Sequence, residues 1–198
     1  HRDRELWTLK EASLRRAALT GSVTLSKLSH LLATLELVDR LLPERQVVAE
    51  FDPLVTGYVR SWHAHDDAAM PALFFAFEVQ WLEVAGLGLD PNACAHCGGE
   101  LAGVDRAQLR VAEGAIVCER CASGGGRWVE GDALRGLRDV VAVGLGDERS
   151  PVIGLEASVR REVGRMLHEH MTFHLADYRL PTALYWLAAG REAASERS

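Results

Sequence analysis

Lysine is almost absent from this chain, and no hydrophobic run reaches the length of a membrane span. Only Lys10 and Lys27 occur among the 198 residues, so arginine carries nearly all of the positive charge. A membrane-spanning helix needs roughly 20 apolar residues in sequence, and the first residues do not resemble a signal peptide. We therefore expect a soluble, cytoplasmic protein with no membrane partner. Because the first residue is His1 instead of methionine, we also expect a fragment or a processed chain.

An excess of positive charge is missing as well. The chain has 28 acidic and 22 basic residues and a formal net charge of −6. A protein that coats nucleic acid with its whole surface needs a basic excess, so this composition is compatible only with a local basic patch. With 48% hydrophobic residues the chain can bury a core, and its length predicts one domain with a small insert.

Cysteine is scarce, but all four cysteines stand in two Cys-x-x-Cys pairs. Cys94 and Cys97 form the first pair, and Cys118 and Cys121 form the second after 20 intervening residues. This spacing is typical of four thiolates around one tetrahedral ion, and a reducing compartment disfavours disulfides. We interpret the four cysteines as ligands of a structural Zn²⁺ with no open coordination position. Iron in the same cage and redox-active dithiols are the remaining alternatives.

Most of the chain is patterned as helices, because apolar residues recur at three- and four-residue steps between proline and glycine boundaries. The expected helices span about 23–42, 52–63, 71–85, 131–143 and 155–177, and a last one starts at Pro181. The segment 71–85 is apolar on most of its circumference, so we expect it to be the central, buried helix. It leads directly into the first cysteine pair.

Two further segments have the alternation of β-strands. Residues 108–111 and 115–117 flank Glu113-Gly114 and predict a hairpin that ends in the second cysteine pair, with 123–126 as a flexible exit. Residues 4–10 alternate in the same way and predict a short strand. The fold class expected from these patterns is mainly α, with a four-cysteine zinc module inserted in a helical domain.

Several histidines lie at spacings that resemble metal sites. His96 stands inside the first cysteine pair, but four sulfurs already fill a tetrahedral shell, so we favour a solvent-facing or hydrogen-bonding role. His63, His65 and Asp66 stand at a predicted helix end, where polar residues are common in any case. The ordinary interpretation is therefore preferred for both groups.

His170 and His174 are four residues apart on a predicted helix, as in a zinc-binding histidine pair. The metalloprotease pattern needs glutamate directly after the first histidine, where Met171 stands, so ordinary helix positions are favoured. No phosphate-binding loop and no Ser, His and Asp constellation can be placed, and we expect a protein that is not an enzyme.

Arg160, Arg161 and Arg165 are the candidate DNA-binding residues. Three guanidinium groups on one predicted helix can line a phosphate-binding face. The competing interpretation is a solvated face with local ion pairs, since the last 44 residues hold six arginines and six acidic residues.

Two short segments make the order of these features more specific. They are Glu5-Leu6-Trp7-Thr8-Leu9 in the predicted first strand and Leu41-Leu42-Pro43-Glu44-Arg45 at the end of the first helix. Together with a buried helix that runs into the cysteine pairs and the closing segment at 167–175, they make the chain similar to the RecO family of bacterial recombination mediators. The resemblance covers almost the full length.

The resemblance implies an N-terminal OB barrel that binds single-stranded DNA, followed by a helical domain that carries the zinc module. Here only the end of the barrel domain is expected, in residues 1–16, with the last strand of the barrel at 4–10. Residues 17–198 are expected to form the helical domain, with the module at about 90–128. The implied function is to bind single-stranded DNA, anneal strands and, with RecR, help to load RecA onto DNA coated by single-strand-binding protein. The implied location is the cytoplasm, in association with the nucleoid.

Two alternatives stay open. One is a zinc-containing protein-interaction module without DNA binding. The other is a metalloenzyme that uses His63, His65 and Asp66, or His170 and His174.

Overall fold

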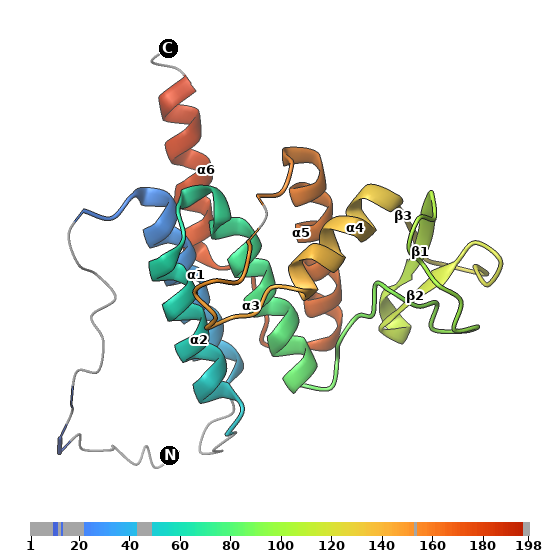
Figure 1. The fold of residues 1–198 in the computed structure, drawn as a ribbon, viewed down its shortest axis with the longest axis horizontal. Coiled ribbons are helices and arrows are strands. Elements are labelled where there is room, and N and C mark those ends of the chain that lie inside the picture. The colour runs from blue at the N-terminus through green and yellow to red at the C-terminus, as the bar shows by residue number, and fades with distance from the viewer. Residues whose placement is uncertain (1–9, 12, 14–21, 43–48, 153, 196–198) are drawn as a thin grey trace, which may run out of the picture.

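The computed structural model describes residues 10–11, 13, 22–42, 49–152 and 154–195. These residues form a mainly α architecture with one small antiparallel sheet (Figure 1). The helices are α1 (Leu25–Leu41), α2 (Phe51–Ala64), α3 (Met70–Val84), α4 (Gly131–Val141), α5 (Ala157–His174) and α6 (Thr182–Ser195), and two 3-10 helices are η1 (Asp67–Ala69) and η2 (Val111–Glu113). The strands are β1 (Arg106–Arg110), β2 (Ala115–Cys118) and β3 (Arg127–Glu130).

The six predicted helices are all present, with boundaries within a few residues of the predicted ones. Local chemistry explains several ends. Helix α1 begins after Thr24, whose hydroxyl accepts the backbone N–H of Lys27 at 3.2 Å. Helix α3 carries Pro71 in its first turn, where the missing N–H of proline costs no hydrogen bond. The strand predicted at residues 4–10 lies outside the described residues except for Lys10.

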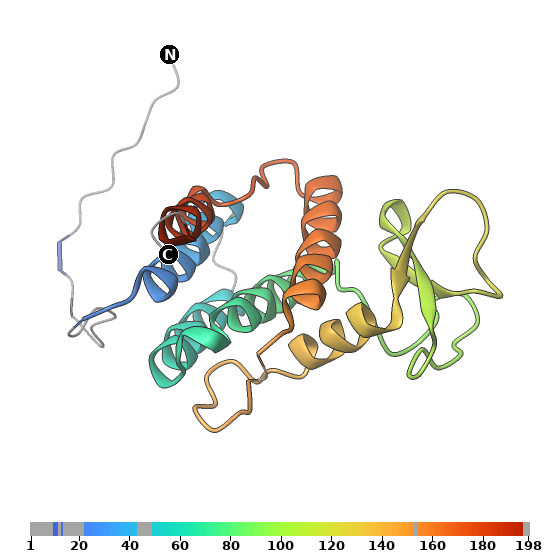
Figure 2. The same ribbon diagram turned by 90° about the horizontal axis from the view of Figure 1, so that it is seen from above.

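Helix α3 is the central helix, as its apolar circumference predicted. Its side chains Leu73 and Phe77 are fully buried, and it contacts α1, α2, α4 and α5. Figures 1 and 2 show it between α1 and α2 on one side and α4 and α5 on the other, while α6 runs alongside α1. Among the described helices, none combines the length and the apolar content that crossing a membrane requires.

The sheet forms one end of the molecule and contains the segment between and after the cysteine pairs. Its strand order is β2-β1-β3, and Ala107 in the central strand is paired with Cys118 on one side and Val129 on the other. The predicted hairpin is confirmed as β1 and β2. Strand β3 was not predicted, because the segment was expected to pass from a flexible exit directly into a helix. We call residues 90–130 the cysteine module.

The cysteine module and the helices share one hydrophobic core. Leu109 and Ile116 from the sheet belong to the same buried cluster as Leu137 of α4 and Leu167 of α5. The passage from β3 into α4 is tight at Gly131, where a Cβ atom would lie 2.3 Å from the carbonyl oxygen of Val104. The module is therefore packed onto the helical body as part of one domain.

Candidate metal centre

Two tight turns present the four cysteines. In the first, Cys94 and Gly98 are joined by a hydrogen bond from the Gly98 N–H to the Cys94 carbonyl at 2.8 Å, and Gly98 has a positive φ of 68°. In the second, the N–H of Cys121 donates to the Cys118 carbonyl at 3.0 Å. Ala95 links the two turns, since its N–H donates to the carbonyl of Ile116 in β2 at 3.0 Å. The β1–β2 hairpin thus returns the second pair to the first.

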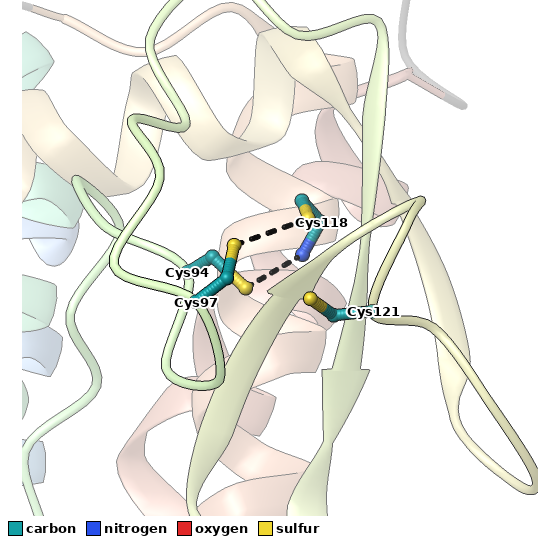
Figure 3. A group of neighbouring side chains, drawn as sticks. All are labelled: Cys94, Cys97, Cys118 and Cys121. Atoms are coloured by element: carbon teal, nitrogen blue, oxygen red, sulfur yellow. Dashed lines mark hydrogen bonds between the residues drawn. The ribbon is translucent and has the colours of Figure 1, made fainter.

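The four sulfur atoms form one cluster, with all Sγ atoms within 4.8 Å of one another (Figure 3). The sulfurs of Cys97 and Cys118 are 3.8 Å apart, and the backbone N–H of Cys118 donates to the sulfur of Cys94 at 3.3 Å. Tetrahedral zinc with Zn–S bonds of about 2.3 Å separates its sulfurs by about 3.8 Å. The described part of the chain contains no other group of three or more potential metal ligands.

The four thiols differ in how readily they lose their protons, and a bound cation would favour the ionised form of each. Burial opposes ionisation of Cys94, but hydrogen bonds from the backbone of Cys118, Cys97 and His96 outweigh it and lower its pKa to about 6. Hydrogen bonds with Cys97 and Cys118 raise the pKa of Cys121 to about 12. Neighbouring thiolates at this separation repel one another, and a bound dication would allow all four to ionise. These residues can therefore hold one metal ion with no ligand position left open.

His96 beside the cysteine cluster, and His65 and Asp66 at the end of α2, are engaged in hydrogen bonds. His96 lies with Nε2 3.2 Å from a carboxylate oxygen of Glu113, so it has the hydrogen-bonding role that was favoured. The ring nitrogens of His65 lie 2.8 Å and 3.2 Å from the carbonyl oxygens of Ser61 and Ser150, and a neutral ring donates to one of the two. Asp66 accepts the N–H groups of Ala68 and Ala69 and so caps η1. These side chains form no joint ligand set.

His170 and His174 connect α5 to the cysteine module. The Nε2 atom of His170 lies 2.8 Å from the Leu87 carbonyl oxygen, and that of His174 lies 2.7 Å from the Val111 carbonyl oxygen. Both nitrogens that a zinc pair would present are therefore occupied by backbone carbonyls. The ordinary interpretation of this pair is consistent with the structure, although the sequence did not indicate their partners.

Arg127 forms a second connection that sequence reasoning missed. Its guanidinium donates from β3 to the carboxylates of Glu162 and Glu169 in α5, the latter at 2.9 Å. No spacing rule could indicate these pairs, because 35 and 42 positions separate the partners.

The three candidate DNA-binding arginines lie on α5 but have different surroundings. Arg161 is exposed, and Arg165 has a side chain 60% exposed and lies 3.5 Å from Glu162. Arg160 borders a groove of about 230 Å³ between α1, α3, α5 and α6. The other residues that line the groove are His30, Pro71, Phe74, Phe75, Leu184 and Leu187. The structure thus places Arg161 and Arg165 one turn apart on the surface and Arg160 beside an apolar groove.

Comparison with known proteins gives consistent results. Residues 23–183 match the family described as Recombination protein O C terminal. The DNA repair protein RecO of Frankia casuarinae is 32% identical over 142 residues, which cover 71% of this chain and 55% of that protein. RecO of Geobacter sulfurreducens is 36% identical over 86 residues, 43% of this chain and 34% of that protein. No solved structure gives a significant match.

The chain therefore spans about half of the first relative and a third of the second. The match to the family, in contrast, runs from just before α1 into the first turn of α6 and includes the whole cysteine module. By the extent of this match, the chain belongs to the RecO family.

Proposed function

We propose that this chain is the helical part of a DNA repair and recombination mediator. In this role the whole protein binds single-stranded DNA, anneals complementary strands and, with RecR, helps to load RecA onto DNA coated by single-strand-binding protein. The observation that carries the proposal is the family match over residues 23–183, supported by two relatives named as DNA repair proteins. The proposed action is binding alone, without catalysis, at the nucleoid in the cytoplasm.

The proposed domain division follows the family resemblance. Residues 1–16 end an N-terminal OB-fold domain, and residues 17–198 form the helical domain. The cysteine module belongs to this helical domain, which is supported by their shared core.

The proposed cofactor is one structural Zn²⁺, held by Cys94, Cys97, Cys118 and Cys121. The cluster of sulfurs within 4.8 Å supports a tetrahedral ion. Bound zinc would supply folding energy, because apparent binding free energies of such sites are on the order of 10–16 kcal/mol. The residues around it would then hold β1 and β2 in register with the two turns.

The proposed DNA contact involves Arg161 and Arg165, with Arg160 at the edge of the same helix. Arg165 lies only loosely against Glu162, whose carboxylate is also bound by Arg127. A phosphate group could therefore replace this weak partner without leaving Glu162 unpaired.

A protein-interaction module without DNA binding is the second candidate. The apolar groove bordered by Arg160 favours it, since grooves of this kind bind protein partners as well as small ligands. A metalloenzyme is less well supported, because among the described residues only the four cysteines form a group of three or more potential ligands, and Nε2 of His170 and of His174 is engaged with a backbone carbonyl.

A salt titration of the full-length protein tests the proposal. The logarithm of its binding constant for a single-stranded oligonucleotide, measured by fluorescence anisotropy, should fall linearly with the logarithm of salt concentration. Replacing both Arg161 and Arg165 by alanine should lower the salt slope by about 1 for each of the two side chains that binds a phosphate. Arg135→Ala is the matched control, because Arg135 is a similarly exposed arginine on α4 that pairs with Asp132.

The outcomes separate the two candidates. Weak, salt-insensitive binding by the full-length protein would contradict a DNA-binding mediator and favour the interaction module. Salt-dependent binding that the double alanine variant leaves unchanged would assign the DNA contact to another surface.

A further inference from the structure

His170 and His174 lie against each other at the joint between α5 and the cysteine module. Their ring centroids are 4.5 Å apart, one helical turn along α5. Each ring has its Nε2 atom within hydrogen-bonding distance of a backbone carbonyl, at 2.8 Å and 2.7 Å. Because a carbonyl oxygen can only accept, both Nε2 atoms carry a proton and donate it.

The two carbonyls belong to different parts of the chain that position the module. Leu87 lies in the connection between α3 and the first cysteine pair, and Val111 lies in η2 at the tip of the β1–β2 hairpin. Gly114, with a φ of 61°, lies beside both rings, since a Cβ atom there would be in van der Waals contact with Cε1 of His170 at 3.5 Å and Nε2 of His174 at 3.8 Å. The two imidazoles therefore bind the connection before the first cysteine pair and the tip of the β1–β2 hairpin to the same helix, α5.

The second nitrogen of His170 has no partner. Its side chain is 0% exposed, and its Nδ1 atom is buried without a hydrogen bond. A proton added there would create a buried charge with no acceptor beside a second imidazole. Burial is the main reason that the pKa of His170 is lowered, the Leu87 carbonyl opposes the shift, and His174 adds to it.

No ion pair offsets such a charge. Among the described residues, no acidic side chain forms an ion pair with either imidazole, and the elements packed against α5 here are η2, α3 and α4. Most of their charged residues have other partners, while the carboxylate of Glu83, although exposed, lies against Gly88 beside the Leu87 carbonyl. In η2, Glu113 is bound to Arg110 and His96, and in α3, Glu78 is hydrogen-bonded to Tyr178 while Glu83 is exposed. In α4, Arg138 donates to the carbonyls of Pro91 and Leu101, Asp132 pairs with Arg135, and Asp139 is half-exposed. On α5 itself, Glu169 pairs with Arg127.

We propose that His170, together with His174, forms a pH-sensitive latch. The two rings fix the connection before the first cysteine pair and the tip of the β1–β2 hairpin to α5 while His170 is neutral, and protonation of His170 releases them. The direction of the pH dependence follows from the linkage between proton binding and opening of the joint. A histidine with a lowered pKa in the closed state binds its proton more readily when the joint opens, so the latch is stable at neutral pH and weakens as pH falls below the ordinary histidine pKa of about 6.5. In the open state the connection at 86–91 and the tip of the β1–β2 hairpin are free of α5, while the core that the module shares with α4 and α5 stays packed.

Hydrogen exchange of the full-length protein tests the latch. Protection of the segments 86–91 and 109–116 is measured by mass spectrometry at about pH 7.5 and about pH 5.5, corrected for the intrinsic exchange rate, with metal content determined in each sample. The opening constant of both segments should rise by up to about tenfold per pH unit below the ordinary histidine pKa. Segments within α3 should not follow.

The double variant His170→Gln with His174→Gln is the control. Glutamine can donate an Nε2–H to each carbonyl but does not titrate, while the cysteines and their own pH dependence are unchanged. The protection of both segments should then lose the pH dependence seen in the wild type, apart from the part due to metal loss. The same pH dependence in both proteins, or none in the wild type, would overturn the proposal.

A second measurement keeps the test decisive if the double variant does not fold. Side-chain ¹⁵N NMR of the wild type should show His170 as the Nε2–H tautomer at neutral pH, and its titration should coincide with shifts of the Gly114 amide. A titrating His170 with an unaffected Gly114 amide would overturn the latch equally well.

Discussion

The carboxylate of Glu36 in α1 accepts the backbone N–H of Thr182 in α6 at 2.8 Å, although 146 positions separate the two residues. Its other oxygen accepts the N–H of Ala183 at 2.9 Å, and Arg40 holds the carboxylate in an ion pair. The first N–H groups of a helix have no partner within the helix and favour a negative charge. Glu36 thus caps α6 from a distant part of the chain.

Glu36→Ala should therefore loosen α6. We expect a loss of about 1–2 kcal/mol in the free energy of unfolding, with faster hydrogen exchange in the first turn of α6. Glu36→Gln retains an acceptor without the charge and should give a smaller loss. An alanine variant as stable as the wild type in urea unfolding would show that the cap contributes nothing.

Gly131→Ala should destabilise the passage from β3 into α4. The new Cβ atom would lie 2.3 Å from the Val104 carbonyl oxygen, which is backbone and cannot rotate away. The N–H of Gly131 also donates to the backbone carbonyl of Asp105 at 2.6 Å, which holds the glycine in place. We expect a cost of roughly 1–3 kcal/mol in chemical denaturation. Gly125→Ala is the matched control, because a Cβ atom at Gly125 meets nothing within 4 Å. Equal stability of the two variants would contradict the close approach.

Removal of one proposed metal ligand should affect more than the module. Cys97→Ser should release the metal and cost on the order of several kcal/mol, and the shared core should extend the loss of protection from β1 into α4 and α5. Metal analysis and hydrogen exchange measure the two effects. His96→Ala removes a side chain from the same turn and should retain the metal; if it lost metal as readily as Cys97→Ser, the ligand assignment would be wrong.

Glu78 should make stability fall as pH rises. Burial raises the pKa of its carboxyl to about 8, and the hydrogen bond with Tyr178 opposes this shift only in part. Between an unfolded pKa near 4.5 and a folded value near 8, the folded state binds more protons, so the free energy of unfolding decreases with pH over this window.

Glu78→Gln should remove that dependence. The difference in free energy of unfolding between variant and wild type, measured in urea, should increase from about pH 5 to about pH 8 and favour the variant at the upper end. Glu83→Gln, an exposed position on the same helix, should show no such trend. A difference that is constant with pH would mean that Glu78 is ionised in the folded protein throughout the range.

The helices and the cysteine cluster could be predicted because their signals are local. Apolar spacing defines each helix, Pro71 opens α3, and the near-uniform apolar composition of α3 indicated its central position, where Leu73 and Phe77 are fully buried. The spacing of the cysteines alone indicated that their four sulfurs would meet, which the structure confirms. Their role as zinc ligands stays a prediction.

The remaining features depend on partners that sequence patterns do not encode. Strand β3 has only four residues, and its pairing of Val129 with Ala107 joins segments with no common motif. The joint made by Arg127, His170 and His174 uses two distant carboxylates and two backbone carbonyls. Because every residue has a backbone carbonyl, the residue type at a position does not indicate whether its carbonyl will accept a histidine hydrogen bond.

The packing of α6 along α1 sets an order for synthesis of the chain. At about 5–20 residues per second, the 146 positions between Glu36 and Thr182 take roughly 7–30 s to translate. During that time α1 has left the ribosome with one face uncovered, while α2 and α3 are already available to pack against its other face. Chaperones that bind exposed apolar helices can therefore reach this face of α1 before α6 is made, and a truncation before α6 would leave it permanently accessible.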